Sequence, residues 1–422
     1  MKSVVLILSI IACAFPATAQ DQCRSTLYKE ELIKQYPGIN SRFAGIESFT
    51  QNWISRQKTS VNDLNGSGKN LGLITIPVVV HVLFHAGVQN ISDAQIQTQL
   101  DVLNRDYRRL NPDTTKTPQF FSDVAADCGI EFVLAKADPK GNATSGIIRK
   151  HTDLGSFDID DRIKFTVTGG DDAWDADGYL NIWVGNLSSG LLGYSSVPGA
   201  GKSKDGVVIT YSAFGTMGAV TAPFNGGRTA THEIGHWLNL IHTWGDTDCG
   251  SDNVDDTPPQ KAANRGCPGA VKITCGSGPY GDMFMNYMDF TDDACMNMFT
   301  NGQRERMRAL FAPGGVRNPL LNSVAATAVA GASQVEITTG EILSGQVRLY
   351  PNPAVDVVAL QINDTITDPV IFGIYNSTGQ RQMTIRVTQP LQQVNVTSLR
   401  SGIYYIKAEN GKSRNVARLV KM

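Results

Sequence analysis

Three of the six histidines fall within eleven residues, in the pattern HExxHxxNxxH that begins at His232. His232 and His236 are four residues apart, so on a helix their imidazoles lie on one face, one turn apart. Two nitrogen ligands in this arrangement can bind one tetrahedral zinc ion at about 2.0–2.1 Å. Glu233, beside the first ligand, is suited to act as general base toward a water at an open coordination position. The spacing therefore predicts a catalytic zinc site.

The third histidine, His242, requires the helix to end. It lies six residues past His236, too far along the chain to continue the same helical face. The chain must turn back between them, and the turn needs a residue that tolerates positive φ. Asparagine is the next best choice after glycine, and Asn239 stands at that place. We therefore expect His242 to be the third protein ligand, which leaves one position for water.

The elements that would position these side chains are visible upstream. The apolar, β-branched run of residues 74–84 predicts a buried strand, and further strands are expected at IEFVLAK, YLNIWVG and GVVITY. A helix should begin after Ser92 and carry an apolar stripe as far as Leu110, where Asn111 and Pro112 end it. A strand, a helix, several strands and then the metal helix predict an α+β domain.

The window HEIGHWLNLIHTWGD resembles the zinc motif of the metzincin peptidases, usually HExxHxxGxxH, and is most similar to that of the pappalysin (cytophagalysin-type) family. MNYMDF resembles the Met-turn of that family, which implies that Met288 packs beneath the metal. The similarity runs from about residue 74 to residue 311. It implies a metzincin-like catalytic domain with a mixed sheet, a backing helix, the zinc helix and an irregular, disulfide-stapled C-terminal half. Two departures are Asn239 in place of glycine and Phe290 where a tyrosine often stands.

The N-terminus is typical of an exported, latent enzyme. Residues 1–19 form an apolar leader with a small-x-small ending, which predicts a signal peptide, although a lipoprotein box ending at Cys13 is an alternative. Residues 20–60 are interpreted as a pro-segment, followed by a flexible stretch. A thiolate from Cys23 would occupy the open metal position and keep the enzyme inactive, as in zymogens with a cysteine switch. The alternative is a structural cysteine paired with Cys128.

Four further cysteines follow the zinc helix in a segment rich in Gly, Pro and Asp. Export permits disulfides, and four cysteines allow three pairings. The resemblance implies Cys249–Cys275 and Cys267–Cys295.

Carboxylates accumulate between Asp246 and Asp256. An irregular loop of this kind outside the cell suits calcium, which takes six to eight oxygen ligands. DNVDDTP resembles a calcium site of the family, and this implies Asp252, Thr257 and the carbonyl of Val254 as ligands. A solvated acidic loop is the alternative.

Two features concern the substrate. LLGYSS resembles the strand at the upper edge of a metzincin cleft, which implies that Gly193 and Tyr194 bind extended polypeptide through backbone hydrogen bonds; a surface loop is the alternative. Relatives favour a basic residue after the scissile bond, and Asp292 or Asp293 would supply the matching charge.

The C-terminal quarter differs in pattern. Residues 317–344 are low in charge and predict a linker after a peptidase domain of residues 61–316. Residues 345–422 contain short alternating strands, which predict a small all-β sandwich. The motifs YPNP, IYNSTGQ and LRSGIYYI resemble the sorting domain of the bacterial type IX secretion system. The resemblance implies export through the outer-membrane secretion machinery, with the product secreted or kept at the cell surface; a carbohydrate- or protein-binding module is the alternative.

The net charge of −2 and the 18% of charged residues give no reason to expect nucleic acid or an anionic membrane as a partner. No segment after the leader is suited to a stable membrane span. The preferred interpretation is a secreted zinc endopeptidase made as a zymogen. Two rival functions are a non-catalytic surface adhesin stabilised by zinc, which would need a fourth protein ligand, and a zinc hydrolase of small peptides or amides.

Overall fold

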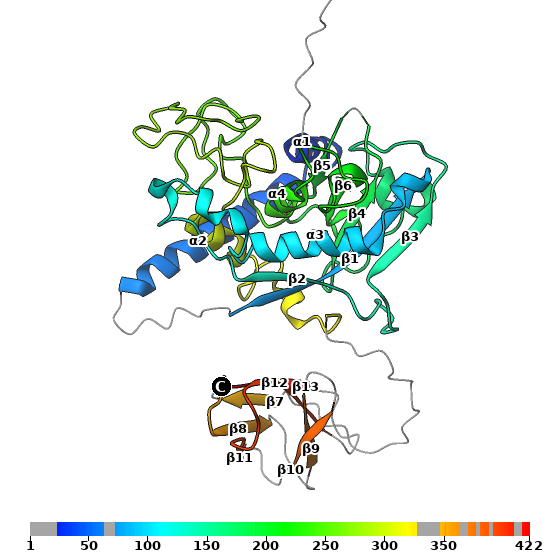
Figure 1. The fold of residues 1–422 in the computed structure, drawn as a ribbon, viewed down its shortest axis with the longest axis vertical. Coiled ribbons are helices and arrows are strands. Elements are labelled where there is room, and N and C mark those ends of the chain that lie inside the picture. The colour runs from blue at the N-terminus through cyan, green and yellow to red at the C-terminus, as the bar shows by residue number, and fades with distance from the viewer. Residues whose placement is uncertain are drawn as a thin grey trace, which may run out of the picture. The chain divides into compact units, whose positions relative to one another are not determined.

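The computed structural model describes residues 23–62, 72–188, 190–326, 347–350, 352–362, 370–376, 380–387, 391–408 and 416–422. The predicted signal peptide and the stretch of residues 63–71 lie outside this part. The chain divides into two compact units, residues 1–331 and 332–422. Each unit is described by itself (Figure 1).

The first unit is built on a six-stranded mixed sheet, with the strand order β2-β1-β4-β6-β5 and β3 also paired with β1. The edge strand β5 runs antiparallel to β6, whereas the other pairs are parallel. The four strands expected from apolar runs are confirmed. The strands are β1 (Ile74–Phe84), β2 (Ile130–Leu134), β3 (Ile147–His151), β4 (Leu180–Gly185), β5 (Gly193–Ser195) and β6 (Val207–Thr210).

One face of this sheet is covered by helices α3 (Asp93–Asp106) and α4 (Arg228–Trp237) (Figure 1). Ser92 caps α3, because its side chain accepts a hydrogen bond from Gln95 N at 3.1 Å. The predicted extension of the apolar stripe to Leu110 was wrong, since Leu110 is 67% exposed. The chain leaves the helix after Asp106 and turns through Arg109, whose φ is 49°.

The predicted pro-segment forms two helices, α1 (Ser25–Gln35) and α2 (Ile39–Asn62). Helix α1 lies beside the edge strand β5, and α2 packs against α5 (Asn301–Ala309) (Figure 1). Both helices therefore contact the elements of the peptidase domain.

Between α4 and α5 the chain has little regular structure. Cys249 is paired with Cys275 and Cys267 with Cys295, each pair with Cα atoms 5.6 Å apart. These are the pairings that the family resemblance implies. Cys23 and Cys128 both carry free thiols, so the alternative pairing of these two is absent from the structure.

The first unit extends beyond the boundary expected at residue 316. Residues 318–322 form the short 3₁₀ helix η8 (Asn318–Asn322), and Leu320 and Ala325 are buried. These residues pack on the first unit because their apolar side chains join its core clusters, so the start of the predicted linker was placed too early. The remainder of the predicted linker lies outside the described residues. Among the described helices, none has the length and apolarity to cross a membrane.

The second unit consists of two antiparallel sheets, ordered β10-β9-β12-β13 and β11-β8-β7. Buried side chains from both sheets belong to one hydrophobic cluster. The packing of the sheets as a sandwich remains a prediction. The strands are β7 (Val347–Tyr350), β8 (Val357–Ile362), β9 (Val370–Asn376), β10 (Arg381–Val387), β11 (Leu391–Asn395), β12 (Gly402–Ala408) and β13 (Val416–Lys421).

Candidate metal centre

The three histidines predicted as ligands meet at one point. His232 and His236 lie one turn apart on α4, and His242 approaches from the segment that follows the helix. Their Nε2 atoms are 3.1 Å (His232 to His236), 3.3 Å (His232 to His242) and 3.0 Å (His236 to His242) apart. All three side chains are at least 96% buried.

The opposite nitrogen of each ring faces a hydrogen-bond acceptor. The Nδ1 atoms of His232 and His236 donate to the carbonyls of Tyr287 at 2.7 Å and Leu240 at 2.9 Å, and that of His242 faces the carboxylate of Asp246. These acceptors hold the hydrogen on Nδ1, so three Nε2 lone pairs converge with no hydrogen between them. Burial and the neighbouring imidazoles also lower the pKa of His232 well below its ordinary value. Neutral imidazoles in this arrangement fit a divalent cation.

The turn that brings in His242 depends on Asn239. Its φ is 71°, in the left-handed region that asparagine tolerates. Met288 is fully buried against α4, and any side chain at Gly235 would collide with its sulfur. The role of Met288 beneath the metal stays a prediction.

Glu233 is fully buried and faces the edge strand. Its Oε2 accepts a hydrogen bond from Ser25 Oγ at 2.7 Å, while Oε1 has no partner among the described residues. Burial raises the pKa of Glu233 to about 8, against the lowering effect of the Ser25 hydrogen bond. A Cβ at Gly193 would lie 3.0 Å from Glu233 Cγ, so glycine allows the edge strand to come this close to the helix.

Cys23 completes the cluster. Its sulfur and the ligand nitrogens of the three histidines all lie within 4.8 Å of one another. Among the described residues, this is the one group of three or more His, Cys, Asp or Glu side chains suited to hold a metal. The pro-segment is held at the edge strand by Arg24 N, which donates to Gly193 O at 3.3 Å, and by Ser25 Oγ, which accepts from Ser195 N at 2.8 Å.

Ser25 was missed in the sequence. It bridges Glu233 and Ser195 across separations of 208 and 170 residues. The only local signal was its position two residues after Cys23.

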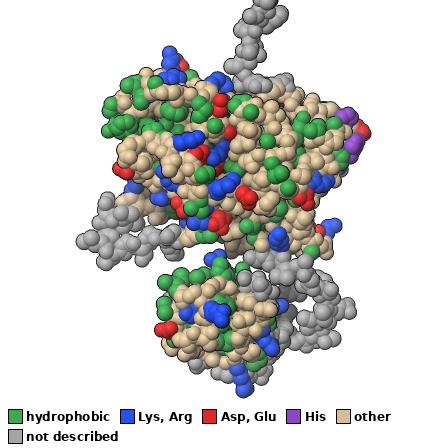
Figure 2. All heavy atoms as spheres, in the orientation of Figure 1, with side chains coloured by type: hydrophobic (Ala, Val, Ile, Leu, Met, Phe, Trp, Pro, Cys, Tyr) green, Lys and Arg blue, Asp and Glu red, His purple; other side chains and the backbone are tan. Residues whose placement is uncertain are grey.

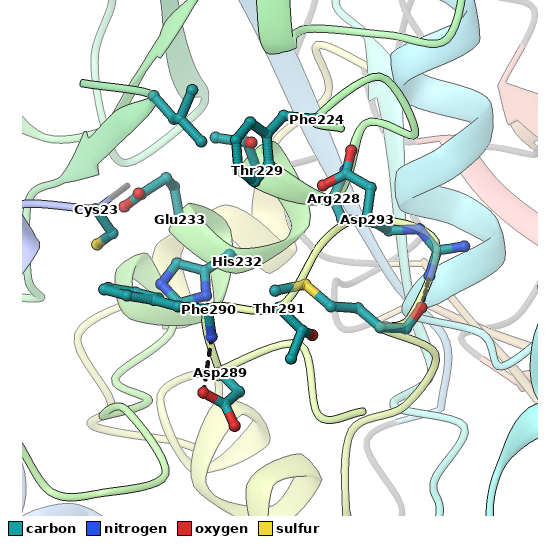
Figure 3. A pocket seen from close by; sticks show the side chains of 12 residues that line it. Cys23, Phe224, Arg228, Thr229, His232, Glu233, Asp289, Phe290, Thr291 and Asp293 are labelled. Atoms are coloured by element: carbon teal, nitrogen blue, oxygen red, sulfur yellow. Dashed lines mark hydrogen bonds between the residues drawn. The ribbon is translucent and has the colours of Figure 1, made fainter. Parts of the chain in front are cut away.

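A pocket beside the histidines extends toward Asp293 (Figure 3). Cys23, Glu233 and His232 line one side of it, and Asp293 lies with Arg228 on the other. Asp293 accepts hydrogen bonds from Gly226 N at 2.7 Å and Arg228 N at 3.3 Å, and burial raises its pKa to about 6. Asp292, the alternative candidate, does not line this pocket.

The aromatic residues of the Met-turn have distinct positions. Phe290 packs against the ligand rings, with centroids 5.5 Å from His232 and 4.8 Å from His242. The hydroxyl of Tyr287 accepts a hydrogen bond from Arg228 at 2.8 Å. Tyr287 is fully buried, and this engaged hydroxyl is not available to take the place of a tyrosine at position 290.

The residues suggested for calcium lie together in one turn. Thr257 Oγ1 donates to the carboxylate of Asp252 at 2.8 Å and is 3.0 Å from Val254 O. Asp252 is 4% exposed. Calcium itself remains a prediction.

This combination of fold and site is that of a metallopeptidase. Residues 167–312 match the family model described as pregnancy-associated plasma protein-A, and residues 348–422 match the secretion system C-terminal sorting domain. An extracellular metalloprotease of Pyricularia oryzae is 35% identical over 253 residues, which cover 57% of this chain and 75% of the relative. One of Arthroderma otae is 34% identical over 245 residues, covering 56% and 76%. The chain belongs to the pappalysin family of metallopeptidases, and it is an extracellular protein with a sorting tail.

Two solved structures from Tannerella forsythia are similar. Mature mirolysin in complex with a cleaved peptide is 48% identical, with a TM-score of 0.59, and the match covers 62% of this chain and 99% of that one. A promirolysin mutant is 43% identical, with a TM-score of 0.64, and covers 74% and 99%. The match to the proenzyme thus covers more of this chain than the match to the mature enzyme.

Proposed function

We propose that the chain is a zinc endopeptidase in which His232, His236 and His242 hold the metal. The observation that carries this proposal is the convergence of three Nε2 lone pairs beside a buried carboxylate. Zinc bound there would act as a Lewis acid that activates water and polarises the scissile carbonyl. The three acceptors behind the rings keep the imidazoles neutral and correctly turned.

Glu233 is the general base. Its carboxylate takes the proton of the attacking water and later passes it to the amine of the leaving product. In the full chain, Ser25 donates to one oxygen of this carboxylate, so the pro-segment must leave before Glu233 is free to react.

The substrate is an extended polypeptide. The backbone of the edge strand β5 already pairs with the pro-segment at Gly193 and Ser195, and a substrate would use the same groups. Asp293 is the better candidate to favour a basic side chain, because it lines the pocket beside the histidines. Backbone pairing at this edge strand argues against a hydrolase restricted to small amides, which have no extended backbone to pair with it.

The full chain is latent. Cys23 would provide the fourth ligand, and its segment covers both Glu233 and the edge strand. A purely structural zinc, as in the adhesin alternative, would need a permanent fourth ligand. Among the described residues, the only candidate near the histidines is Cys23, which belongs to the removable segment.

The C-terminal unit directs the protein to the outer-membrane secretion machinery. The match over residues 348–422 supports this role. Calcium, bound by Asp252, Thr257 and the carbonyl of Val254, would stabilise the irregular segment.

The direct test is Glu233→Gln in the mature enzyme. We expect casein hydrolysis to fall by a factor of about a thousand or more, given that general acid–base catalysis alone contributes 10²–10⁴-fold. Metal analysis should still find one zinc per chain, and a chelator should abolish the activity of the unaltered enzyme. Glu305→Gln, on α5, is the matched control. Retained hydrolysis by Glu233→Gln would contradict the role of this glutamate.

A further inference from the structure

A second buried polar cluster lies away from the metal, on the other face of the sheet. Lys164 is fully buried, and its Nζ forms an ion pair with Asp161 at 3.0 Å and donates to Lys204 O at 3.1 Å. Lys204 also forms an ion pair with Asp161, at 2.9 Å. The proposed mechanism uses none of these charges.

The pro-segment fills the space in front of them with one side chain. The hydroxyl of Tyr28, on α1, donates to Asp161 Oδ1 at 2.7 Å and accepts from Lys164 Nζ at 3.1 Å. Lys164 Nζ lies 4.4 Å from the centroid of the Tyr28 ring, and the ring of Tyr194 is 5.1 Å away at an angle of 50°. Tyr28 is 2% exposed. A phenol is therefore held at both its hydroxyl and its ring.

The groups that hold Tyr28 all belong to the peptidase domain. Asp161 and Lys164 are linked by the backbone of the short helix η4 (Arg162–Lys164), in which Lys164 N donates to Asp161 O at 2.8 Å. Lys204 and Lys164 would still neutralise Asp161 after α1 leaves. One carboxylate acceptor, one ammonium donor and one aromatic wall would remain in place as a preformed recess.

This recess lies beside the strand that binds the substrate. Tyr194 belongs to β5, and it points to the face of the sheet opposite to that on which Gly193 meets Glu233. In a peptide that pairs with β5, every second side chain points to the face of Tyr194. One such side chain can occupy the position that Tyr28 leaves.

We infer that the mature enzyme has a substrate subsite for a phenolic side chain, formed by Asp161, Lys164 and Tyr194, which the full chain fills with its own Tyr28. The inference rests on the proposed function, since it concerns the substrate of the same cleft. A carboxylate in this recess would be repelled by Asp161, and a lysine by Lys164. A neutral side chain that both donates and accepts a hydrogen bond satisfies both, and the phenol of tyrosine does so through one hydroxyl, as Tyr28 does in the full chain.

The test uses mature enzyme and peptide libraries that differ at one position at a time. In the segment of the peptide that pairs with β5, we expect one position to prefer tyrosine. A peptide with tyrosine at that position should have a kcat/KM at least about tenfold higher than the same peptide with phenylalanine. A hydrogen bond to a charged group is strong enough for such a ratio. The Tyr/Phe ratio should fall toward one in Lys164→Met and in Asp161→Asn, and it should be unchanged in Lys202→Met, an exposed lysine used as the control.

The ratio is measured within each preparation, so partial misfolding of a variant would lower both rates and leave the ratio intact. A library that is cleaved without any preference for tyrosine over phenylalanine would overturn the subsite, even if both variants failed to fold. A preference that persists in both variants would also overturn it. A library that is not cleaved at all would instead contradict the proposed peptidase function.

Discussion

Single side chains in the pro-segment contact single groups of the site. Ser25 holds Glu233, Cys23 lies among the histidines, and Tyr28 reaches a separate recess on the far side of β5. The first two contacts concern the proposed chemistry, while the third concerns binding. Substitutions of these residues should therefore have separable effects.

Replacing Cys23 by alanine should weaken latency. The variant loses the proposed fourth ligand but keeps the hydrogen bonds of Ser25 and Tyr28. The segment should therefore remain bound to the peptidase domain, but less tightly. We expect the full chain to show casein hydrolysis at least about tenfold above that of the unaltered proenzyme, which corresponds to ~1.4 kcal/mol at 25 °C. Activity should be measured before the segment is cleaved, with Cys128→Ala as the control. If the Cys23→Ala proenzyme is no more active than the unaltered proenzyme, Cys23 does not act as a switch.

Asn239 offers a test of the turn after the metal helix. Alanine at a φ of 71° should destabilise the protein by about 1–2 kcal/mol, because a Cβ is strained in the left-handed region. Glycine relieves that strain, so the urea midpoint of Asn239→Gly should be closer to that of the unaltered protein than the midpoint of Asn239→Ala is. Both variants lose the side-chain contacts of Asn239 with Glu47 and Thr50, which makes them a matched pair. Identical midpoints for the two variants would refute the argument.

At the scale of elements, α2 attaches the pro-segment to α5. Glu47 pairs with Arg306 of α5, with both carboxylate oxygens at 2.8 Å from guanidinium nitrogens. Arg306 is 1% exposed, and it also donates to the carbonyl of Asn239 at 3.0 Å. One buried arginine thus connects the pro-segment to the turn that brings in His242.

The sequence predicted the elements whose signals are local. The zinc motif, the helix cap at Ser92 and the apolar runs each involve residues that are close together in the sequence. Such signals can be interpreted without knowledge of the tertiary structure. The contacts of Ser25 and Tyr28 join residues more than 130 positions apart, and no periodicity marks them. The end of α3 was placed too late because Leu110 continues the helical spacing, although the backbone turns before it.

The ion pair of Glu47 predicts a pH dependence. Burial alone would raise the pKa of Glu47, but the hydrogen bonds and charge of Arg306 lower it from 4.5 to about 2. A depressed carboxyl pKa contributes stability that is complete above about 4.5 and is lost as the pH falls toward 2. In the Glu233→Gln proenzyme, which should not process itself, Glu47→Gln should lower the urea midpoint at pH 6.

The difference between the two proteins should narrow as the pH is lowered from 5 toward 3, because the carboxylate of the unfolded chain is then protonated while that of the folded protein, with a pKa of about 2, stays charged. Glu31→Gln, which removes an exposed carboxylate on α1 paired with Lys34, is the control. A difference that stays constant across this range would show that the charge of Glu47 contributes nothing.

At the scale of the whole molecule, the site and the sorting domain belong to two different units, which have separate hydrophobic clusters. All of the site residues lie in residues 1–331, and the sorting domain lies in residues 332–422. On the face shown in Figure 2, acidic and basic side chains of the first unit are interspersed.

This division predicts that catalysis and export can be separated. A chain truncated after residue 326 retains every described element of the first unit, including η8. Because the two units have separate cores, we expect the purified truncated enzyme to hydrolyse casein within about twofold of the complete one after maturation. In a bacterium that has this secretion system, the truncated protein should accumulate inside the outer membrane, whereas the complete chain reaches the medium, as measured by immunoblots of both fractions.

The reciprocal experiment shows whether the second unit alone is a sufficient signal for export. Residues 332–422, fused to a reporter protein that has its own signal peptide, should bring the reporter into the medium, because the unit has a buried core of its own and can fold without the peptidase. Export of the truncated peptidase, or retention of the fused reporter, would mean that the first unit contributes to recognition by the machinery. Success in both arms would assign export to the second unit and leave the metal centre, the pro-segment and the tyrosine recess to the first.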